Sequence, residues 1–331
     1  MLALRLHPGG ALRLHHEPEP SPAPGEVLVR VAAVGLCGSD RHWLLEGSIG
    51  DAVVDEPLVL GHEFAGIAET GRYRDRLVAA DPTINCERCP PCRSGAANLC
   101  LNQRFAGYSG TDGALRELVA WPERLLYPLA DTVHSAEGAI VEPLAVAANA
   151  VDLAGGLDGA TVGVVGCGPI GLLIVSLARE AGAAAILATD PLPHRLAAAV
   201  RRGATAVDEG GLADGAGLDV VFEVAGEDAA VDAAIQQAKP RGQVILVGIP
   251  ARDTTSFRAS VARRKGLTLR LTRRSTPRSF EQAVQLAEQH AFDLSGLVTH
   301  RVPLAEAERA FAALAAREGL KVIVEPRGAL A

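Results

Sequence analysis

The sequence predicts an α/β protein in two parts: a doubly wound parallel sheet of the Rossmann type and a β-rich domain that carries a cysteine cluster. Three observations predict this fold class. Short alternating strands and turn residues fill the first part, apolar strand-like runs alternate with helical stretches in the second, and a glycine-rich turn joins the first of those runs to a helix. A chain of 331 residues is also longer than one core usually supports.

The β-rich part is expected at residues 1–147. Val27, Val29 and Val31 alternate with polar or small residues, as in a half-buried strand. Four prolines between residues 18 and 24 precede them and predict an exposed, extended lead-in. A lobe rich in Gly and Cys, residues 85–100, interrupts the strands.

The second domain is expected at residues 148–275. Its predicted strands are apolar and short: Thr161–Val165, Ala185–Thr189, Ala206–Val207, Asp219–Val224, Gln243–Val247 and Leu267–Leu271. Helical stretches separate them at Gly171–Ala181, His194–Arg202 and Asp228–Ala238. This alternation implies a parallel sheet covered on both faces. The uncharged run Ala160–Ala178 has the length of a membrane span, but its four glycines and Pro169 favour a strand, a turn and a helix.

The tail, residues 276–331, is expected to return to the first domain. Two helical faces are apolar, one at Phe280, Ala283, Val284 and Ala287 and the other at Leu304, Ala307, Phe311 and Leu314. Lys321–Val324 is a candidate final strand.

Composition narrows the class of protein. A net charge of −7 favours neither nucleic acid nor an anionic membrane as a partner, and 48% hydrophobic with 21% charged residues suits a globular chain. The N-terminus lacks the long apolar stretch of a signal peptide, so a cytoplasmic protein is expected.

A dinucleotide site is predicted where the first strand of the second domain meets its helix. The motif is Gly166-Cys167-Gly168-Pro169-Ile170-Gly171. Its three glycines allow the tight turn, the approach of the pyrophosphate and close packing of the helix, whose N-terminus faces the phosphates. Asp190 ends the next strand, can bind the adenosine ribose and would repel a 2′-phosphate, so NAD is favoured. Arg195 follows closely and can instead hold a phosphate, which leaves NADP open.

The cysteine lobe predicts a structural metal. Its four cysteines have the spacing C-x2-C-x2-C-x7-C: Cys86, Cys89, Cys92 and Cys100. In a chain without an export signal this cluster indicates a metal rather than disulfides. Four thiolates complete a tetrahedral zinc and leave no open position, and an iron–sulfur cluster is the competing interpretation. Glu87 beside Arg88 and Arg93 does not favour a nucleic-acid zinc finger.

A second metal site is suggested by Cys37, His62, Glu63 and Glu142 in combination. Alone, each has a plain explanation as a small buried side chain, a structural His or a solvated Glu. Together they offer thiolate, imidazole and carboxylate groups, which are donors that zinc accepts.

From Cys37 onwards the chain resembles the zinc-dependent medium-chain dehydrogenase/reductase (alcohol dehydrogenase) family, most closely its sorbitol (polyol) dehydrogenase branch. The matching segments, in family order, are Cys37–Asp40 (CGSD), Gly61–Glu63 (GHE), the cysteine lobe, Glu142–Val146 (EPLAV), the GCGPIG turn and Asp190. The resemblance implies a GroES-like catalytic domain, an NAD-binding Rossmann domain and two zinc ions, one catalytic and one structural.

The resemblance also implies roles for single residues. In the polyol branch Cys37, His62 and Glu63 would surround the catalytic zinc, with Glu142 holding a zinc-bound water or entering the shell; which Glu binds directly stays open. Ser39 and His42 match the family's proton relay, a task suited to a His because its pKa lies near physiological pH.

Substrate residues are expected from the same resemblance at Trp43, Phe105, Tyr108 and Arg274, with ordinary packing or a solvated charge as the alternative for each.

The implied reaction is hydride transfer from a secondary hydroxyl of a polyol, sugar or (amino)cyclitol to NAD. L-threonine 3-dehydrogenase or a simple alcohol dehydrogenase is the alternative, and a non-catalytic NAD-binding protein a remote one. A homodimer or homotetramer is implied. The chain departs from the family in a shortened loop at residues 70–78 and in Asn149, where a His is common.

Overall fold

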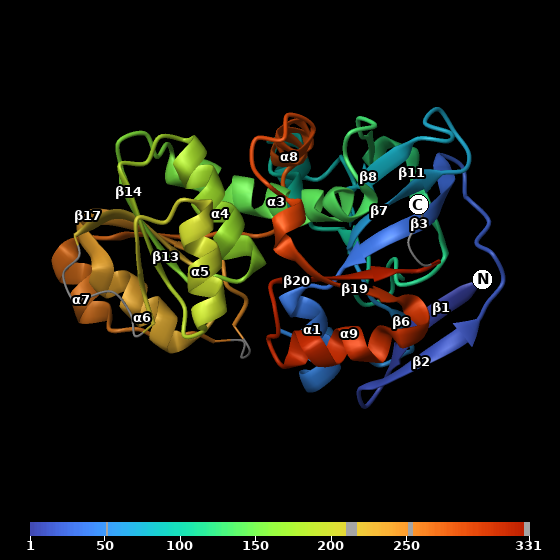
Figure 1. Cartoon of the computed structure of the whole chain (residues 1–331), viewed down its shortest axis with the longest axis horizontal. Coiled ribbons are helices and arrows are strands. Elements are labelled where there is room, and N and C mark those ends of the chain that lie inside the picture. Colours follow the sequence, from blue (N-terminus) through green and yellow to red (C-terminus); the bar gives the residue numbers. More distant parts are fainter. Residues whose placement is uncertain (51, 210–216, 251–253, 328–331) are drawn as a thin grey trace. The chain divides into compact units, whose positions relative to one another are not determined.

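A computed structural model describes residues 1–50, 52–209, 217–250 and 254–327 of the chain. The chain forms two compact units (Figure 1): unit 1 comprises Met1–Glu142 with Thr276–Ala331, and unit 2 comprises Pro143–Ser275. The first crossing between the units lies inside helix α3 (Ser135–Ala154), where the boundary expected after residue 147 also falls. The second crossing follows Ser275.

Unit 1 is built on a seven-stranded sheet. Its path runs through β12 (Leu126–Pro128), β8 (Leu77–Ala80), β7 (Glu63–Ala68), β3 (Glu26–Gly35), β20 (Lys321–Glu325) and β19 (Val298–Pro303), and β11 (Leu118–Pro122) also pairs with β3. The tail therefore returns to the N-terminal strands, since β20 pairs antiparallel with β3. Val27, Val29 and Val31 are buried and alternate with half-buried residues, which confirms the predicted strand.

Smaller elements surround this sheet. The short strands are β1 (Leu2–His7), β2 (Ala11–His16), β4 (Ser48–Ile49), β5 (Ala52–Val53), β6 (Leu58–Val59), β9 (Thr83–Ile84) and β10 (Arg104–Phe105). The α-helices are α1 (Gly38–Glu46), α2 (Pro90–Arg93), α8 (Pro277–Glu288) and α9 (Ala307–Ala315). The 3-10 turns are η1 (Ala97–Leu99), η2 (Glu123–Leu125), η3 (Ser295–Leu297) and η4 (Leu304–Glu306). Helix α8 begins at a capping box, in which the Thr276 hydroxyl accepts a hydrogen bond from the Ser279 N–H.

Helix α3 packs on one face of the large sheet. Ala136 and Ala139 form a buried cluster with Ala33 of β3 and Ile323 of β20. A Cβ on Gly138 would lie 2.8 Å from the Cβ of Ala65, so helix and sheet approach closely there. Glu142, the last unit 1 residue of α3, follows this contact by about one helical turn.

Unit 2 is a doubly wound six-stranded sheet in the order β15 (Ala206–Asp208), β14 (Ala185–Thr189), β13 (Thr161–Val165), β16 (Leu218–Glu223), β17 (Ala238–Leu246) and β18 (Thr268–Leu271). All its pairings are parallel, as predicted. Its helices are α4 (Pro169–Glu180), α5 (Pro193–Arg202), α6 (Asp228–Gln237) and α7 (Ala259–Lys265). Because the strand order reverses at β13, right-handed crossovers place α4 and α5 on one face and α6 and α7 on the other (Figure 1).

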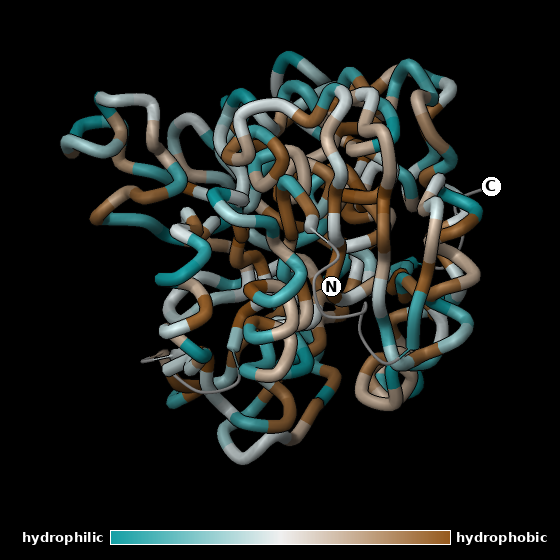
Figure 2. Tube along the Cα trace, turned by 90° about the vertical axis from the view of Figure 1, so that its left-hand side faces the viewer, coloured by the Kyte–Doolittle hydropathy of each residue, from teal (hydrophilic) through white to brown (hydrophobic). Residues whose placement is uncertain are grey.

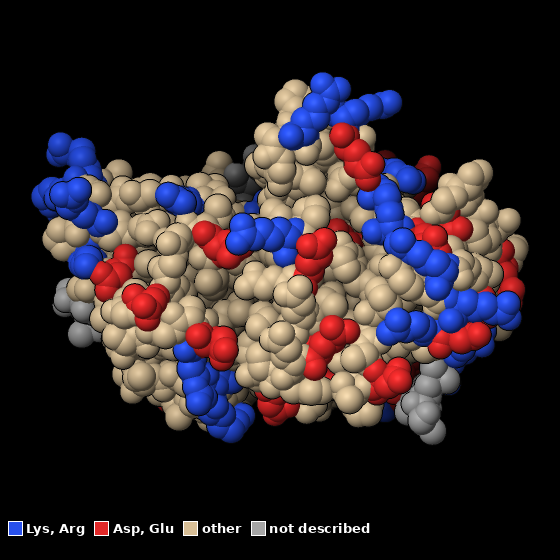
Figure 3. All heavy atoms as spheres, turned by 90° about the horizontal axis from the view of Figure 1, so that it is seen from above, with Lys and Arg blue, Asp and Glu red and all other residues tan. Residues whose placement is uncertain are grey.

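Hydropathy follows this layering. In Figure 2 many apolar segments lie in the interior of the trace, whereas many hydrophilic segments lie in its outer turns. On the face shown in Figure 3, basic and acidic side chains are interspersed among uncharged ones. Within the described residues, the structure contains no helix with the length and apolarity needed to cross a membrane. The uncharged run at residues 160–178 is strand β13, a turn and most of α4.

Candidate active site

The end of strand β3 and the start of strand β7 bring three metal-binding side chains together. Cys37 follows β3 and caps helix α1, while His62 and Glu63 stand at the start of β7. The Cys37 sulfur, a ring nitrogen of His62 and a carboxylate oxygen of Glu63 all lie within 4.8 Å of one another. Thiolate, imidazole and carboxylate are donors that zinc accepts, so these residues fit a zinc ion with a position left open.

A fourth polar side chain, the carboxyl group of Glu142 in α3, is buried beside them. It lies outside the set whose ligand atoms are all within 4.8 Å. Burial raises the pKa of the Glu142 carboxyl to about 8, with His62 opposing the rise and Glu63 and Cys37 adding to it. Burial also raises the pKa of the Cys37 thiol to about 12, again with Glu63 adding to the rise. A dication would offset this concentration of buried acids, which supports the fit to a metal.

Asp40 of the CGSD segment, for which the sequence predicts no separate role, is fully buried at 0% exposure. One carboxylate oxygen accepts a hydrogen bond from the Cys37 N–H at 2.9 Å. The other lies 3.9 Å from Nδ1 of His62 and has no hydrogen-bond partner in the described structure. A carboxylate behind a metal-binding imidazole orients the ring and fixes its tautomer. Asp40 therefore holds the Cys37 backbone and lies behind the His62 ring without a hydrogen bond to it.

Lys321 of β20 also belongs to this cluster, and the sequence did not single it out. It is 2% exposed, and its Nζ donates to both carboxylate oxygens of Glu63, at 2.9 and 2.6 Å, and to the Leu36 carbonyl at 3.0 Å. Gly35 makes this pair possible, because a Cβ at that position would lie 2.2 Å from a Glu63 oxygen. An ion pair between residues so far apart in sequence carries no local signal.

The expected relay residues both lie on α1. The Ser39 hydroxyl forms a hydrogen bond with the Cys37 thiol. His42 lies one helical turn after Ser39, and its Nδ1 is 2.9 Å from a Glu46 carboxylate oxygen. The structure thus places a hydroxyl beside the candidate metal ligand and an imidazole on the same helix.

Three of the four expected substrate residues belong to unit 1 and make aromatic contacts there. The Phe105 ring packs against the His62 ring with centroids 5.2 Å apart, and Trp43 meets Tyr108 edge-on at 5.3 Å. Trp43 is only 2% exposed and contributes to the hydrophobic core, so packing accounts for most of its surface.

Arg274, the fourth, belongs to unit 2. Its backbone has a φ of 55°, in the left-handed region. Asn149 holds this segment, since its Nδ2 donates to the Arg274 carbonyl at 2.7 Å and to the Thr272 hydroxyl at 3.1 Å. The departure at Asn149 therefore has a structural role: it fixes the segment that carries Arg274.

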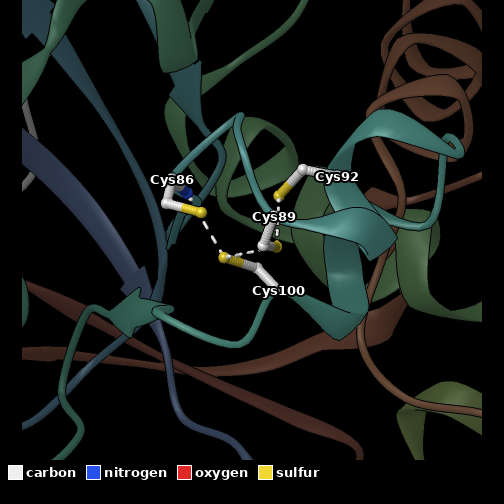
Figure 4. Close-up of side chains that lie close together, drawn as sticks. All are labelled: Cys86, Cys89, Cys92 and Cys100. Atoms are coloured by element: carbon white, nitrogen blue, oxygen red, sulfur yellow. Dashed lines mark hydrogen bonds between the residues drawn. The ribbon is translucent and has the colours of Figure 1, made fainter.

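The cysteine lobe closes on itself (Figure 4). The four sulfur atoms point toward one another and all lie within 4.8 Å. Backbone N–H groups of Cys86 and Asn102 donate to the Cys100 sulfur at 3.3 and 3.4 Å. Hydrogen bonds from the Arg88 and Cys89 backbones lower the pKa of the Cys86 thiol to about 6. Four free thiols at this spacing, with amides directed at sulfur, fit a tetrahedral zinc.

The glycine-rich turn of unit 2 has the geometry of a dinucleotide loop. Gly166 has a φ of 99°, and a Cβ on Gly171 would lie 1.9 Å from the Gly166 carbonyl oxygen, so both positions need glycine. Gly168 precedes α4, whose first residues are Pro169 and Ile170. The helix N-terminus therefore opens directly from the turn, as phosphate binding requires.

Asp190 anchors this loop from the end of β14. Its carboxylate is 4% exposed and accepts hydrogen bonds from the N–H groups of Cys167 at 2.8 Å and Leu192 at 2.9 Å. Arg195 Nη1 lies 3.6 Å from the same carboxylate. A carboxylate has acceptor positions beyond these two hydrogen bonds, so Asp190 can fix the loop and still accept from a ligand.

Family models match both units of this chain. Residues 23–131 match the alcohol dehydrogenase GroES-like domain, and residues 169–289 match the zinc-binding dehydrogenase domain. D-xylulose reductase A of Aspergillus niger is 34% identical over 338 residues, which cover 95% of this chain and 94% of the relative.

Solved structures of other dehydrogenases also superpose on nearly the whole chain. L-idonate 5-dehydrogenase of Escherichia coli superposes with a TM-score of 0.92 at 27% identity and covers 98% of this chain and 97% of its own. A Sinorhizobium meliloti protein assigned as a zinc-binding dehydrogenase and solved with NADP has a TM-score of 0.89 at 31% identity, covering 98% and 99%.

Proposed function

The chain belongs to the zinc-dependent medium-chain dehydrogenase family and is an oxidoreductase, and on that premise we propose that it transfers hydride from a secondary hydroxyl of a polyol, sugar or (amino)cyclitol to NAD. One observation carries the proposal: Cys37, His62 and Glu63 offer a zinc-type donor set within 4.8 Å. Its relatives are named for D-xylulose and L-idonate, a ketose and a sugar acid.

The donor set indicates how unit 1 would handle substrate. Zinc held there would supply a Lewis acid for the substrate oxygen. Asp40 accepts a hydrogen bond from the Cys37 backbone and lies 3.9 Å from the His62 ring, and Glu142 adds a buried carboxyl beside the set. Ser39 would accept the hydroxyl proton of the substrate while giving up its own proton toward His42, and His42 would release a proton to solvent from the same helix.

For the lobe, we propose a second, structural zinc bound by Cys86, Cys89, Cys92 and Cys100. The four sulfurs are all protein ligands and face one another, so a zinc ion there would have no position for substrate. Its role would be to fix a segment of the chain that contains little regular structure beyond α2 and η1.

The family membership gives a nicotinamide cofactor, and we propose NAD over NADP. Asp190 stands where a 2′-phosphate would meet its charge. NADP is the alternative cofactor, because one structural relative was solved with NADP. Arg195 lies beside Gly168 and could bind a phosphate there. Asp190→Ala should reduce the ratio of NAD to NADP affinity by roughly tenfold or more, as measured by fluorescence titration of both dinucleotides.

Substrate contacts are proposed for Trp43, Phe105 and Tyr108 of unit 1 and for Arg274 of unit 2. A site with several carboxylates and a hydroxyl favours polyhydroxylated substrates over plain aliphatic alcohols. L-threonine or a simple alcohol remains the alternative, because those substrates use the same zinc and cofactor chemistry.

The assembly and location are proposals of the same kind. A homo-oligomer fits unit 2, where β18 forms one end of the sheet path and its Leu271 is 77% exposed. A cytoplasmic location is proposed from the sequence alone.

The test is NAD reduction by the purified protein on a panel of pentitols, hexitols, sugar acids, cyclitols, L-threonine and primary alcohols. The proposal expects kcat/KM to be highest for a compound with a secondary hydroxyl flanked by other hydroxyls. A clear preference for L-threonine or a primary alcohol would establish the alternative, and binding of NAD without turnover of any compound would contradict enzymatic function.

A further inference from the structure

Lys321 is a lysine buried among acids, and we propose that it acts as a positioning residue that takes the place of metal charge at the candidate site. By pairing with Glu63 it keeps the metal-free site folded, and by the same pairing it weakens zinc binding at Cys37, His62 and Glu63. The inference rests on the proposed function only in assuming that these three residues bind zinc.

The strand order creates the pair. Strands β7 and β20 flank β3 on either side, so Glu63 and Lys321 approach each other across β3. Gly35 of β3 pairs with Glu63 on one side and with Ile323 on the other. Since Gly35 has no side chain, the two charged groups meet over it, at distances of 2.6 and 2.9 Å.

The ammonium group of Lys321 is fully paired. An ammonium has three donors, and they go to the two Glu63 oxygens and the Leu36 carbonyl. The side chains of Lys321 and Glu63 are 2% and 1% exposed, so water does not replace either partner. Around them lie His62 and further acids, namely Cys37, Asp40 and Glu142. Lys321 therefore supplies a fixed positive charge inside a cluster that is otherwise mostly acidic.

Removing the Lys321 charge should increase the zinc affinity of the site. A buried carboxylate that loses its only cation is strongly destabilising, and this cost applies fully to the metal-free protein. In the zinc-loaded protein Glu63 keeps a cationic partner, so the cost is smaller. The loss of Lys321 thus destabilises the metal-free protein more than the zinc-loaded protein. Since zinc binding and folding are linked, this difference in stability is measured as tighter zinc binding. Repulsion between the ammonium and a dication acts in the same direction. A lysine that merely shapes the site predicts the opposite, since a displaced Glu63 would bind zinc more weakly.

The experiment compares the full-length wild type with Lys321→Met, Lys321→Arg and the double variant Lys321→Met/Glu63→Gln. Zinc affinity is measured by competition with a colorimetric chelator, and the release curve of Cys37→Ala identifies the lobe zinc. Thermal unfolding is followed with and without zinc. Lys321→Met should bind the site zinc on the order of tenfold more tightly and should unfold at a lower temperature only when metal-free. Lys321→Arg should resemble the wild type, because it keeps the charge.

The double variant keeps the inference testable if Lys321→Met does not fold without metal. With both charges removed, the metal-free double variant should be more stable than Lys321→Met. Equal or weaker zinc binding by Lys321→Met, or no recovery in the double variant, would overturn the inference. One zinc in the wild type would overturn the proposed function together with it, whereas two zincs with unchanged affinity in Lys321→Met would overturn this inference alone.

Discussion

The two candidate metal sites of unit 1 are assembled in opposite ways. The lobe draws its four sulfurs from residues 86–100, and its backbone amides point at sulfur from the same segment. The Cys37 site draws on β3, β7, α3 and β20, and its Lys321–Glu63 pair joins residues separated by 258 positions. The lobe depends on local chain geometry, whereas the Cys37 site depends on the register of the whole sheet.

This difference indicates different tasks. Four facing thiols leave no position for a further ligand, and their loss should affect folding. Three mixed donors lie beside Glu142, Asp40 and Lys321, and a metal held by them would keep a position open for substrate, so their loss should affect chemistry. Substitutions in the lobe should therefore lower stability, and substitutions at the Cys37 site should lower activity.

The largest effect is expected for Cys37→Ala. Removal of the thiolate would take away a proposed ligand of the metal that polarises the substrate oxygen, and kcat/KM should fall by roughly 10³-fold or more. The unfolding temperature should change by only a few degrees, because the lobe is intact. Steady-state kinetics on the best substrate measures the first quantity and differential scanning calorimetry the second. Activity within tenfold of wild type would remove Cys37 from the catalytic metal site.

Cys100→Ala should show the reverse behaviour. Loss of a structural zinc costs folding free energy directly, so the unfolding temperature should fall by about 10 °C or more. Below that temperature kcat/KM should stay within several-fold of wild type. Calorimetry and kinetics on the same samples as Cys37→Ala make each variant the control for the other. A specific loss of activity with unchanged stability would argue that the lobe takes part in catalysis.

The raised pKa of Glu142 predicts that the stability of the metal-free protein depends on pH. Its folded-state pKa of about 8 lies above its value in an unfolded chain, so the folded protein holds the proton more tightly. Its contribution to stability is complete below the unfolded pKa and is lost as pH rises toward 8. The metal-free protein should therefore unfold roughly 5 °C or more lower at pH 8 than at pH 5.

Glu142→Gln should flatten that slope, because Gln does not titrate. Thermal unfolding of metal-free wild type and variant across this pH range checks it. The same slope in both proteins would show that Glu142 is not the group responsible.

The smallest effect is expected for Asn149→Ala in unit 2. Two hydrogen bonds to the Thr272–Arg274 segment would be lost, which should cost about 1–2 kcal/mol of unfolding free energy. If Arg274 contacts substrate, KM should rise while zinc content stays unchanged. Thr272→Val, which removes one of the two bonds, should show a smaller effect in both measurements. An unchanged KM in Asn149→Ala would separate this segment from substrate binding.

Local patterns predicted what is local. The strands β13 and β14 begin and end where the apolar runs do, because a parallel strand buried on both faces is a short apolar run bounded by turns. The glycine turn and the lobe were also predictable, since a few adjacent residues determine them. The two acids beside Cys37 could not be distinguished, because the β3–β7 register decides that Glu63, and not Glu142, lies within 4.8 Å of both other donors.

Lys321 and Asp40 required the structure for the same reason. Lysine in an apolar strand such as Lys321–Glu325 looks like an edge residue until β20 is seen to pair with β3. Asp40 looks like an ordinary helix-start acid, and only the position of His62 gives it a second contact. The family resemblance predicted that Trp43 contacts substrate, while in the structure the Trp43 side chain is part of the hydrophobic core.

The most direct test of the account is zinc per chain, measured by elemental analysis on wild type and Cys37→Ala side by side. The account predicts two zinc ions in the wild type and one in the variant, with the remaining zinc held by the lobe. One zinc in both proteins would contradict it, because the Cys37, His62 and Glu63 cluster would then bind no metal, and the assignment of this cluster as the catalytic centre would fail.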